Sequence, residues 1–232
     1  MKINPITQNL LWNSNLEFTF FPHTHNVSQK ILYRSFWDIW EYRDKIYTQI
    51  SNQNYSNECM EKIEEIFIVA QEWNLTLHYW EDRATGRTKF YISLYWLSFK
   101  KSLIILSRIR KILRLDRYFL EKDFHQFDCL GFDLLENSMT LKVYELLSHK
   151  TQYITLLPEY ISSENIKEIW VLKTNNRKKI FFRLKTAIKP PESLSIENKL
   201  QELKTTLWSL YSLECKMTYY CIEGNKEEIY FI

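Results

Sequence analysis

The sequence predicts an α+β protein in which antiparallel β-hairpins alternate with amphipathic helices around a ten-stranded barrel. Segments that alternate apolar and polar residues occur in pairs around short polar turns, with centres near positions 25, 85, 137, 175 and 224. Stretches with apolar residues at helical spacing lie between these pairs. Five pairs give ten strands, and closing such a sheet removes its edges and leaves one face lining a lumen.

The first hairpin has two interpretations. Leu16, Phe18 and Phe20 alternate with polar neighbours and predict a strand. The following residues, 29–50, fit either one amphipathic helix or a strand around 32–37 followed by a helix. Only the second interpretation supplies a fifth hairpin. The five hairpins then recur along the sequence as an internal repeat, which indicates a fold built from repeated supersecondary units.

The other four hairpins are marked by their turns. They span Leu75–Leu97 about Ala84–Arg87, Phe127–Leu147 about Glu136–Ser138, Glu168–Lys185 about Asn175–Asn176, and Lys216–Ile232 about Gly224–Asn225. Two of the three glycines stand at these turns, where a positive φ is needed.

Apolar stripes at helical spacing predict the intervening helices. Ser56 is positioned to cap a helix that carries Met60, Ile63, Phe67 and Ala70 on one face. Two further stripes run from Leu103 to Leu113 and from Ile196 to Leu210, and 151–164 shows a weaker one. These helices would form an outer ring around the barrel.

Composition describes an ordinary folded protein of 232 residues and 28.4 kDa, which we expect to form a single domain over 1–232. The formal charge of +3 is too small to indicate nucleic acid. The first residues lack the features of a signal peptide, and no stretch is apolar enough to span a bilayer. The four cysteines form no CxxC pair, so a reduced, cytoplasmic protein is expected.

Alternation along the strands separates two faces. The apolar face, expected to lie beneath the helices, comprises Phe90, Ile92, Leu94, Leu141, Val143, Ile180 and Phe182. The opposite face, expected to line the lumen, comprises Lys89, Tyr91, Tyr95, Lys142, Tyr144, Lys179, Arg183 and Tyr230. Because enclosed cations repel one another, an anionic ligand is the simplest reason to keep them.

A basic, tyrosine-rich lumen suits the ionisation of an allylic diphosphate. Cations stabilise the departing diphosphate, and aromatic walls shelter the carbocation from water. An acceptor that attacks the carbocation must then lose a proton to a base. Glu17 is the candidate for that base.

Short motifs in this sequence resemble the ABBA-type prenyltransferases, and most nearly the cyanobactin-type peptide prenyltransferases. The segment Gly131-Phe-Asp-Leu-Leu-Glu-Asn-Ser-Met-Thr-Leu-Lys-Val-Tyr144 is similar to the third hairpin of that family, a G-x-D-L strand returning as L-K-hydrophobic-aromatic. Asn15-Leu-Glu-Phe-Thr19 is similar to the strand that carries the family's acceptor-contacting glutamate. Lys89-Phe-Tyr91 and Ile229-Tyr-Phe231 are similar to the ends of other repeats.

The resemblance implies a PT-barrel built from repeated αββ(α) units. It implies transfer of a dimethylallyl or geranyl group from its diphosphate, the co-substrate, to an aromatic or nucleophilic side chain of a small or cyclic peptide in natural-product (RiPP) biosynthesis. An indole or phenol metabolite is the alternative acceptor, and magnesium dependence stays open. The predicted site assigns Glu17 to the acceptor's proton, and His78 and Trp80 to acceptor contact. Diphosphate binding falls to Arg34, Lys89, Lys142, Lys179 and Arg183, and the cation shield to Tyr91, Tyr144, Tyr220 and Tyr230.

A different class of function stays open beside this one. A half-solvated antiparallel sheet also alternates lysine and tyrosine, so the chain could be a non-catalytic binding module with a basic face. His23 and His25 resemble a metal pair, but no third ligand follows at suitable spacing, so a turn without metal is expected. There is no aspartate-rich DDxxD run, P-loop, Rossmann fingerprint or nucleophile elbow.

Overall fold

The structure is a computed structural model that describes residues 14–22, 24, 26–34, 47–48, 50–53, 55–82, 87–115, 127–147, 151–174, 177–192 and 217–231. It contains ten strands. They are β1 (Ser14–Phe21), β2 (Asn26–Arg34), β3 (Thr76–Asp82), β4 (Arg87–Ser93), β5 (Cys129–Leu135), β6 (Ser138–Leu146), β7 (Ile166–Lys173), β8 (Lys178–Ile188), β9 (Met217–Glu223) and β10 (Lys226–Phe231).

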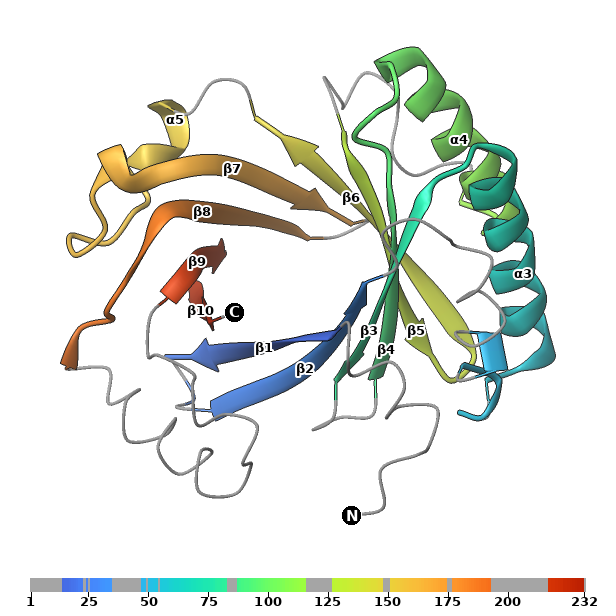
Figure 1. Cartoon of the computed structure of the whole chain (residues 1–232), viewed down its shortest axis with the longest axis horizontal. Helices are drawn as coiled ribbons and strands as arrows, with labels where there is room; N and C mark the ends of the chain where they lie inside the picture. The colour runs from blue at the N-terminus through green and yellow to red at the C-terminus, as the bar shows by residue number, and fades with distance from the viewer. Residues whose placement is uncertain are drawn as a thin grey trace.

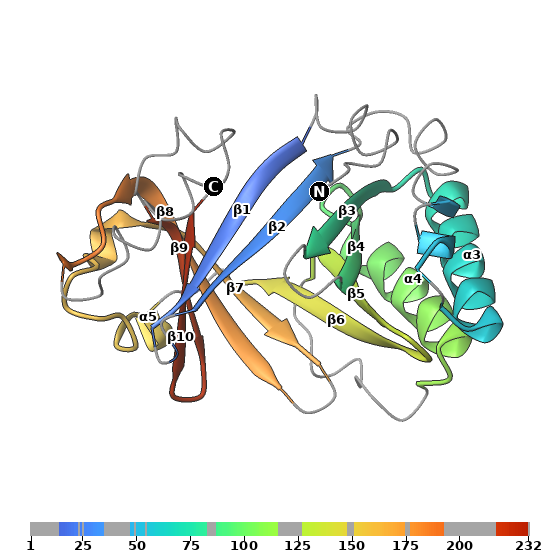
Figure 2. The same ribbon diagram turned by 90° about the horizontal axis from the view of Figure 1, so that it is seen from below.

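The strands form one antiparallel sheet that closes on itself. Each strand pairs with its neighbours in sequence, and β1 also pairs with β10, Phe18 lying opposite Phe231. The strands therefore surround a common axis (Figures 1 and 2). Among the described residues every strand has a partner strand on each side, so no strand is a free edge of the sheet.

The five predicted hairpins are confirmed as the pairs β1–β2, β3–β4, β5–β6, β7–β8 and β9–β10. The first hairpin forms because residues 26–34 are a strand. The second interpretation expected a strand in this region but placed it around 32–37, several residues later than observed. In the last hairpin Gly224 has a φ of +59°, a conformation that glycine adopts without steric cost.

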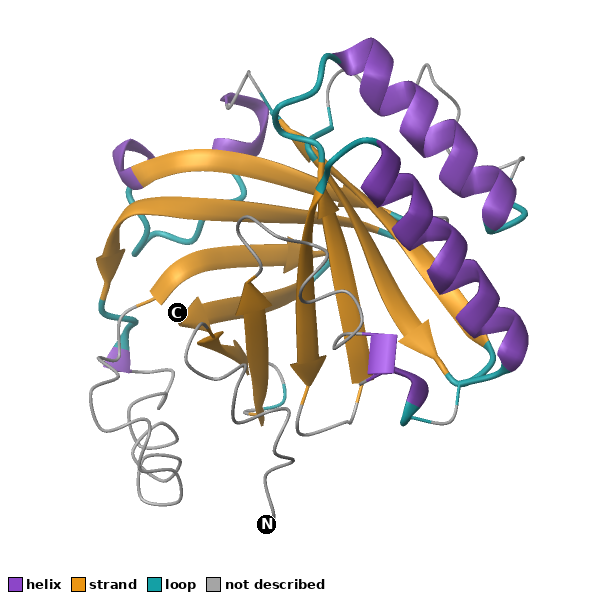
Figure 3. Cartoon of the chain, turned by 45° about the vertical axis from the view of Figure 1, so that its right-hand side comes forward, coloured by secondary structure: helices purple, strands orange, loops and turns teal. Residues whose placement is uncertain are grey.

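Two long helices lie along the outside of β3 to β6, as Figure 3 shows. They are α3 (Asn57–Glu72) and α4 (Phe99–Ile112), and the predicted cap of α3 is confirmed because the side chain of Ser56 accepts a hydrogen bond from the Cys59 amide. A short helix α5 (Thr151–Ile154) and the 3-10 turn η2 (Ser163–Asn165) precede β7. The predicted stripe from Ile196 to Leu210 lies outside the described residues, so an outer helical layer is described only in part.

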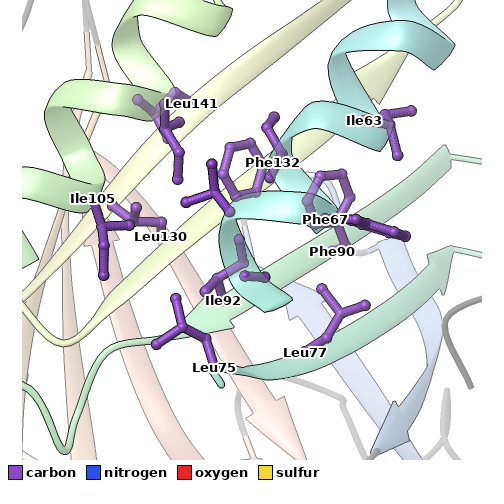
Figure 4. Packing of buried hydrophobic residues seen from close by; sticks show 14 of the residues in the cluster. Ile63, Phe67, Leu75, Leu77, Phe90, Ile92, Ile105, Leu130, Phe132 and Leu141 are labelled. Atoms are coloured by element: carbon purple, nitrogen blue, oxygen red, sulfur yellow. The ribbon is translucent and has the colours of Figure 1, made fainter. Parts of the chain in front are cut away.

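The largest core cluster lies between the helices and the outer face of β3 to β6 (Figure 4). Phe67 of α3 meets the edge of Phe90, with ring centroids 5.3 Å apart, and Phe90 stacks on Phe132 at 4.5 Å. Ile63 and Ile105 add the apolar faces of the two helices. The predicted assignment of the apolar face to the helix side is therefore confirmed here, and it leaves the other face of these strands for the lumen.

A second core cluster lies on the outer face of β7 to β10 and of β1. Phe20, Ile229, Tyr220, Phe182 and Ile169 are successive partners in the register and are all buried. Each of these five belongs to a different strand, from β1 through β10, β9 and β8 to β7. This continuous apolar row fixes which residues of β7 to β10 face inward.

Candidate functional site

A row of aromatic rings crosses the inner face of the barrel. Its members are Tyr91, Tyr144, Phe181 and Tyr230, which come from β4, β6, β8 and β10. Successive ring centroids lie 5.8, 6.2 and 5.9 Å apart, each pair in a tilted arrangement. Tilted contacts at this distance are favourable, so these four side chains support one another.

Small residues on the intervening strands make room for the row. Gly131 pairs with Tyr91 on one side and with Lys142 on the other. A Cβ at Gly131 would stand 2.8 Å from Tyr91 Cε1 and 3.0 Å from Tyr144 Cε2. Cys221 has the corresponding place between Phe181 and Glu228. Larger side chains on β5 and β9 would push the rings into the lumen.

The lysines of β4 and β6 share a carboxylate on the strand between them. Lys142 Nζ lies 2.5 Å from Asp133 Oδ2, and Lys89 Nζ lies 3.8 Å from Asp133 Oδ1. All three side chains are largely shielded from solvent. Asp133 therefore holds the ammonium groups of Lys89 and Lys142 close together on the inner face of the barrel.

Lys179 of β8 forms a second group with residues of β10. Its ammonium contacts Glu228 and donates a hydrogen bond to the Tyr230 hydroxyl at 3.2 Å, and that hydroxyl donates to Glu228 at 2.6 Å. The ammonium also lies 5.1 Å from the ring centre of Phe181. Burial by itself lowers the pKa of Lys179, but Cys221 and Glu228 outweigh it and hold the pKa above its ordinary value. Lys179 is thus a buried, protonated cation beside the aromatic row.

Arg183 belongs to a third, more open group. Its guanidinium lies 3.1 Å from a Glu168 oxygen and 5.9 Å from the ring centre of Tyr219. The same Glu168 oxygen accepts a hydrogen bond from the Trp170 indole at 3.3 Å. The Arg183 side chain is 41% exposed, whereas the ion-paired lysines above are 12 to 19% exposed. Arg183 therefore meets solvent far more than the lysines do.

These pairings correct the expected electrostatics of the lumen. The four predicted cations with described side chains, Lys89, Lys142, Lys179 and Arg183, share three carboxylates. Those carboxylates are Asp133, Glu168 and Glu228, none of which belonged to the predicted site. Mutual repulsion is therefore not a reason to infer an anionic ligand, because the fold itself supplies the counter-charges. Asp133 lies directly opposite Lys89, and only this strand register reveals the pairing.

Two predicted lumen tyrosines lie elsewhere. Tyr220 is buried in the outer cluster, 6.1 Å from Phe182, so it does not face the aromatic row. The inward residue of this strand is Tyr219, which pairs with Tyr230 and Arg183. Tyr95 lies beyond the end of β4 and is 57% exposed. Tyr220 itself lies opposite Ile229, which is also buried in the outer cluster.

The four remaining predicted residues are placed by the register of their strands. Glu17 pairs with Lys30, and the Cα of Thr19, two residues later, is the partner of Tyr230. Arg34 pairs with His78, and Trp80 pairs with Lys89. His78 also lies opposite Tyr91 and is partly buried, so it is a neighbour of the aromatic row.

Burial keeps the inner hydroxyl and thiol groups neutral. It raises the pKa of Tyr144 well above its ordinary value, with a further contribution from Tyr91. It likewise raises the pKa of the Cys129 thiol to about 12, which makes a nucleophilic thiolate at neutral pH unavailable. Among the described residues, no three histidine, cysteine, aspartate or glutamate side chains could hold a metal ion together. The same residues include no helix of the length and apolarity needed to cross a membrane.

Comparison with known proteins identifies the fold. No protein-family model matches the sequence. No curated protein sequence matches it. Solved structures do match. The apo form of the prenyltransferase PriB superposes with a TM-score of 0.63 at 12% identity, over 94% of this chain and 79% of PriB.

Two other structures agree with PriB. The 5-dimethylallyl tryptophan synthase from Streptomyces coelicolor, in complex with DMASPP and Trp, gives a TM-score of 0.62 at 10% identity over 95% of this chain and 78% of that one. AnaPT from Neosartorya fischeri gives 0.52 at 10% identity over 95% and 78% of the two chains. This chain therefore has the fold of the ABBA-type prenyltransferases.

Proposed function

We propose that this protein transfers a short allylic group from its diphosphate to an aromatic acceptor inside the barrel. The observation that carries the proposal is the row from Tyr91 to Tyr230 bordered by buried lysines. The row offers π faces to a carbocation, and the lysines offer ammonium groups to the oxygens of a leaving diphosphate. The fold of the chain, shared with prenyltransferases, supports the same reading.

The reaction requires two bond changes and one proton transfer. The allylic C–O bond breaks, and its electron pair leaves with the diphosphate. The acceptor's π electrons or lone pair then form the new bond to the allylic carbon, and a base removes the acceptor's proton. We assign the base to Glu17, which lies on the strand that pairs with β10. The rings exclude water, which would otherwise quench the carbocation.

For the diphosphate to bind, its oxygens must replace carboxylates as the partners of the inner lysines. The pairs Lys142–Asp133 and Lys179–Glu228 occupy the inner wall before substrate arrives. A diphosphate brings several anionic oxygens and competes with the carboxylates for the same ammonium groups. We propose that Lys89, Lys142 and Lys179 hold it, with Arg34 and Arg183 at the borders of the site.

The proposed acceptor is an aromatic or nucleophilic side chain of a small or cyclic peptide, as the resemblance to cyanobactin-type enzymes implies. A free indole-containing molecule is the alternative, because complexes with tryptophan are described for two structural neighbours. His78 and Trp80 are proposed acceptor contacts, given their register next to Tyr91 and Lys89.

The test is incubation with dimethylallyl and geranyl diphosphates, each combined with L-tryptophan and with linear and cyclic peptides, and read by mass spectrometry. A product heavier by one isoprenoid unit is expected. Lys142→Ala and Glu17→Gln should each lower its rate at least tenfold. The matched control is Lys178→Ala, which removes an exposed lysine from β8. No product with any acceptor, or equal rates in all four proteins, would refute the proposal.

A barrel that binds without catalysing is the second candidate. The carboxylate partners of Lys89, Lys142, Lys179 and Arg183 favour it, because they show that these cations also serve the fold itself. A thermal shift with allylic diphosphate in the absence of any product would support this candidate. Binding of nucleic acid that weakens steeply with salt would instead indicate a basic binding module.

A further inference from the structure

The segment between β4 and α4 concentrates exposed apolar side chains. Of the large hydrophobic residues found exposed in the described part of the chain, four lie within ten positions of one another: Tyr95, Trp96, Phe99 and Ile104. Trp96 is 87% exposed and Ile104 is 44% exposed. Soluble proteins rarely gather such side chains in one place without a use for them. We call residues 95–104 the aromatic tip.

The aromatic tip is held in place by its neighbours in the fold. Leu94 is buried in the core, and its amide donates to the Asp128 carbonyl at 2.7 Å. The Leu97 amide closes the turn by donating to the Leu94 carbonyl at 2.9 Å. Tyr95 and Trp96 meet edge to face at 5.1 Å, and Phe99 meets Phe127 at 6.0 Å. The rings therefore project from an anchored turn.

Cationic side chains accompany the rings. Lys100 and Lys101 are exposed, and with Ile104 they form the outward face of the first turns of α4, opposite the buried Ile105. The sequence from Arg83 to Leu115 contains nine lysines and arginines and no aspartate or glutamate. Arg108 is paired with Glu72 of α3, whereas the part of the chain that the structure describes offers no ion pair to Lys100 or Lys101. The aromatic tip is thus positively charged as well as apolar.

We propose that the aromatic tip binds the surface of an anionic lipid bilayer. Tryptophan and tyrosine favour the interface between lipid headgroups and acyl chains, and lysines beside them are attracted by anionic headgroups. Lysine also keeps its charge in water while its stem lies along an apolar surface. Attachment of this kind is peripheral, by insertion of a few side chains to the depth of the headgroups.

The mixture of side chains favours a bilayer over other anionic partners. A nucleic acid would satisfy Lys100 and Lys101 but offers no hydrocarbon phase for Ile104. An acidic protein would need an apolar patch of its own to cover Trp96 and Phe99. A bilayer supplies both negative charge and a hydrocarbon region to the same small patch. This inference does not depend on the proposed transfer reaction.

The test is cosedimentation of the whole protein with vesicles of phosphatidylcholine alone and with vesicles containing one-third phosphatidylserine. Binding is expected to the second kind and to weaken in high salt. Trp96→Ala should lower the partition coefficient about tenfold. Lys100→Gln combined with Lys101→Gln should lower it about 25-fold, at about fivefold for each lysine near an anionic surface.

Matched controls come from the opposite rim of the barrel. Leu135→Ala removes an exposed apolar residue beside the β5–β6 turn, and Lys226→Gln removes an exposed lysine beside the β9–β10 turn. Both should bind vesicles like the unmodified protein, and circular dichroism should show every variant folded. No binding to the anionic vesicles would overturn the proposal. So would equal loss in the control variants, or binding to a DNA duplex that competes fully with the vesicles.

Discussion

The ring of Tyr91 meets the ring of Tyr144 directly over Gly131, a residue on the strand that separates them. The two centroids lie 5.8 Å apart, and both rings come within 3.0 Å of the place where a Cβ of Gly131 would stand. The glycine is therefore required by the closeness of the rings, because the structure gives it no unusual backbone angle.

Substituting this glycine tests the role of the contact. Gly131→Ala should lower the free energy of unfolding by about 1–3 kcal/mol, since the partly buried rings of Tyr91 and Tyr144 must move to admit a methyl group. It should also reduce the thermal shift produced by dimethylallyl diphosphate. Urea denaturation measures the first effect. Gly224→Ala is the control. It should cost about 1 kcal/mol because of its φ of +59°, and it should leave the ligand response intact. Equal ligand responses in both variants would contradict the assignment of the two rings.

Asp133→Asn should separate the structural and binding roles of the inner lysines. The amide keeps the shape of the carboxylate but removes the charge that holds Lys142 at 2.5 Å and Lys89 at 3.8 Å. Stability should fall by about 1–3 kcal/mol. The stabilisation by inorganic pyrophosphate should increase, because the competing carboxylate is gone. Differential scanning fluorimetry measures both, with Glu136→Gln at the exposed turn as the control. A smaller pyrophosphate response would mean that Asp133 organises the lysines for the ligand.

Lys179→Met should make stability depend on acid pH. The substitution leaves the Glu228 carboxylate shielded from solvent without its cation, which should cost about 3 kcal/mol at pH 7. Protonation of that carboxylate relieves the cost, so the difference from the unmodified protein should shrink as pH falls toward 5. Thermal melts across this range provide the measurement. Lys178→Met, one residue away and exposed, should show no such pH dependence. A stability difference between the two proteins that stays constant across this pH range would show that another group compensates the charge of Glu228.

Tyr144→Phe should reduce the loss of stability at high pH. Burial raises the pKa of Tyr144 well above its ordinary value of 10.0, so the folded state favours the neutral phenol. The stability linked to this group is fully present below pH 10 and is lost as pH rises beyond it, because the unfolded chain ionises first. The melting temperature of the unmodified protein should therefore fall more steeply above pH 10 than that of the variant. Parallel curves would show that Tyr144 is accessible enough to ionise in the fold.

Alternation in the sequence was sufficient to predict the last four hairpins and the helix-facing side of their strands, whereas it left the first hairpin with two interpretations. The placement of Phe90, Ile92 and Val143 beneath the helices follows from their adjacent residues alone, because side chains alternate between the two faces of a strand. The same reasoning identified Tyr91, Tyr144 and Tyr230 as inward. It was wrong for Tyr220, which the register of the last hairpin places opposite the buried Ile229, whereas Tyr219 lies opposite Tyr230.

The pairing of the inner-wall carboxylates with the lysines and Arg183 was beyond this kind of reasoning. Glu228 contacts Lys179 from a strand 49 residues away, and no local pattern relates them. Glu168 follows a bulge near the start of β7, which changes the count of alternating positions. Charge pairing inside a closed sheet depends on strand register and on side-chain reach. Both of these emerge only when the whole barrel is assembled.

The pairing of β1 with β10 has a consequence for biosynthesis. Phe18, Thr19 and Phe20 take their partners from residues 229–231, so the ring cannot close until nearly all of this sequence has left the ribosome. Contacts over so long a sequence separation form slowly. Until β10 is added, a nascent sheet of nine strands exposes two unpaired edges that are prone to aggregation. The need for chaperones during synthesis should therefore depend on how soon β10 is synthesised and pairs with β1.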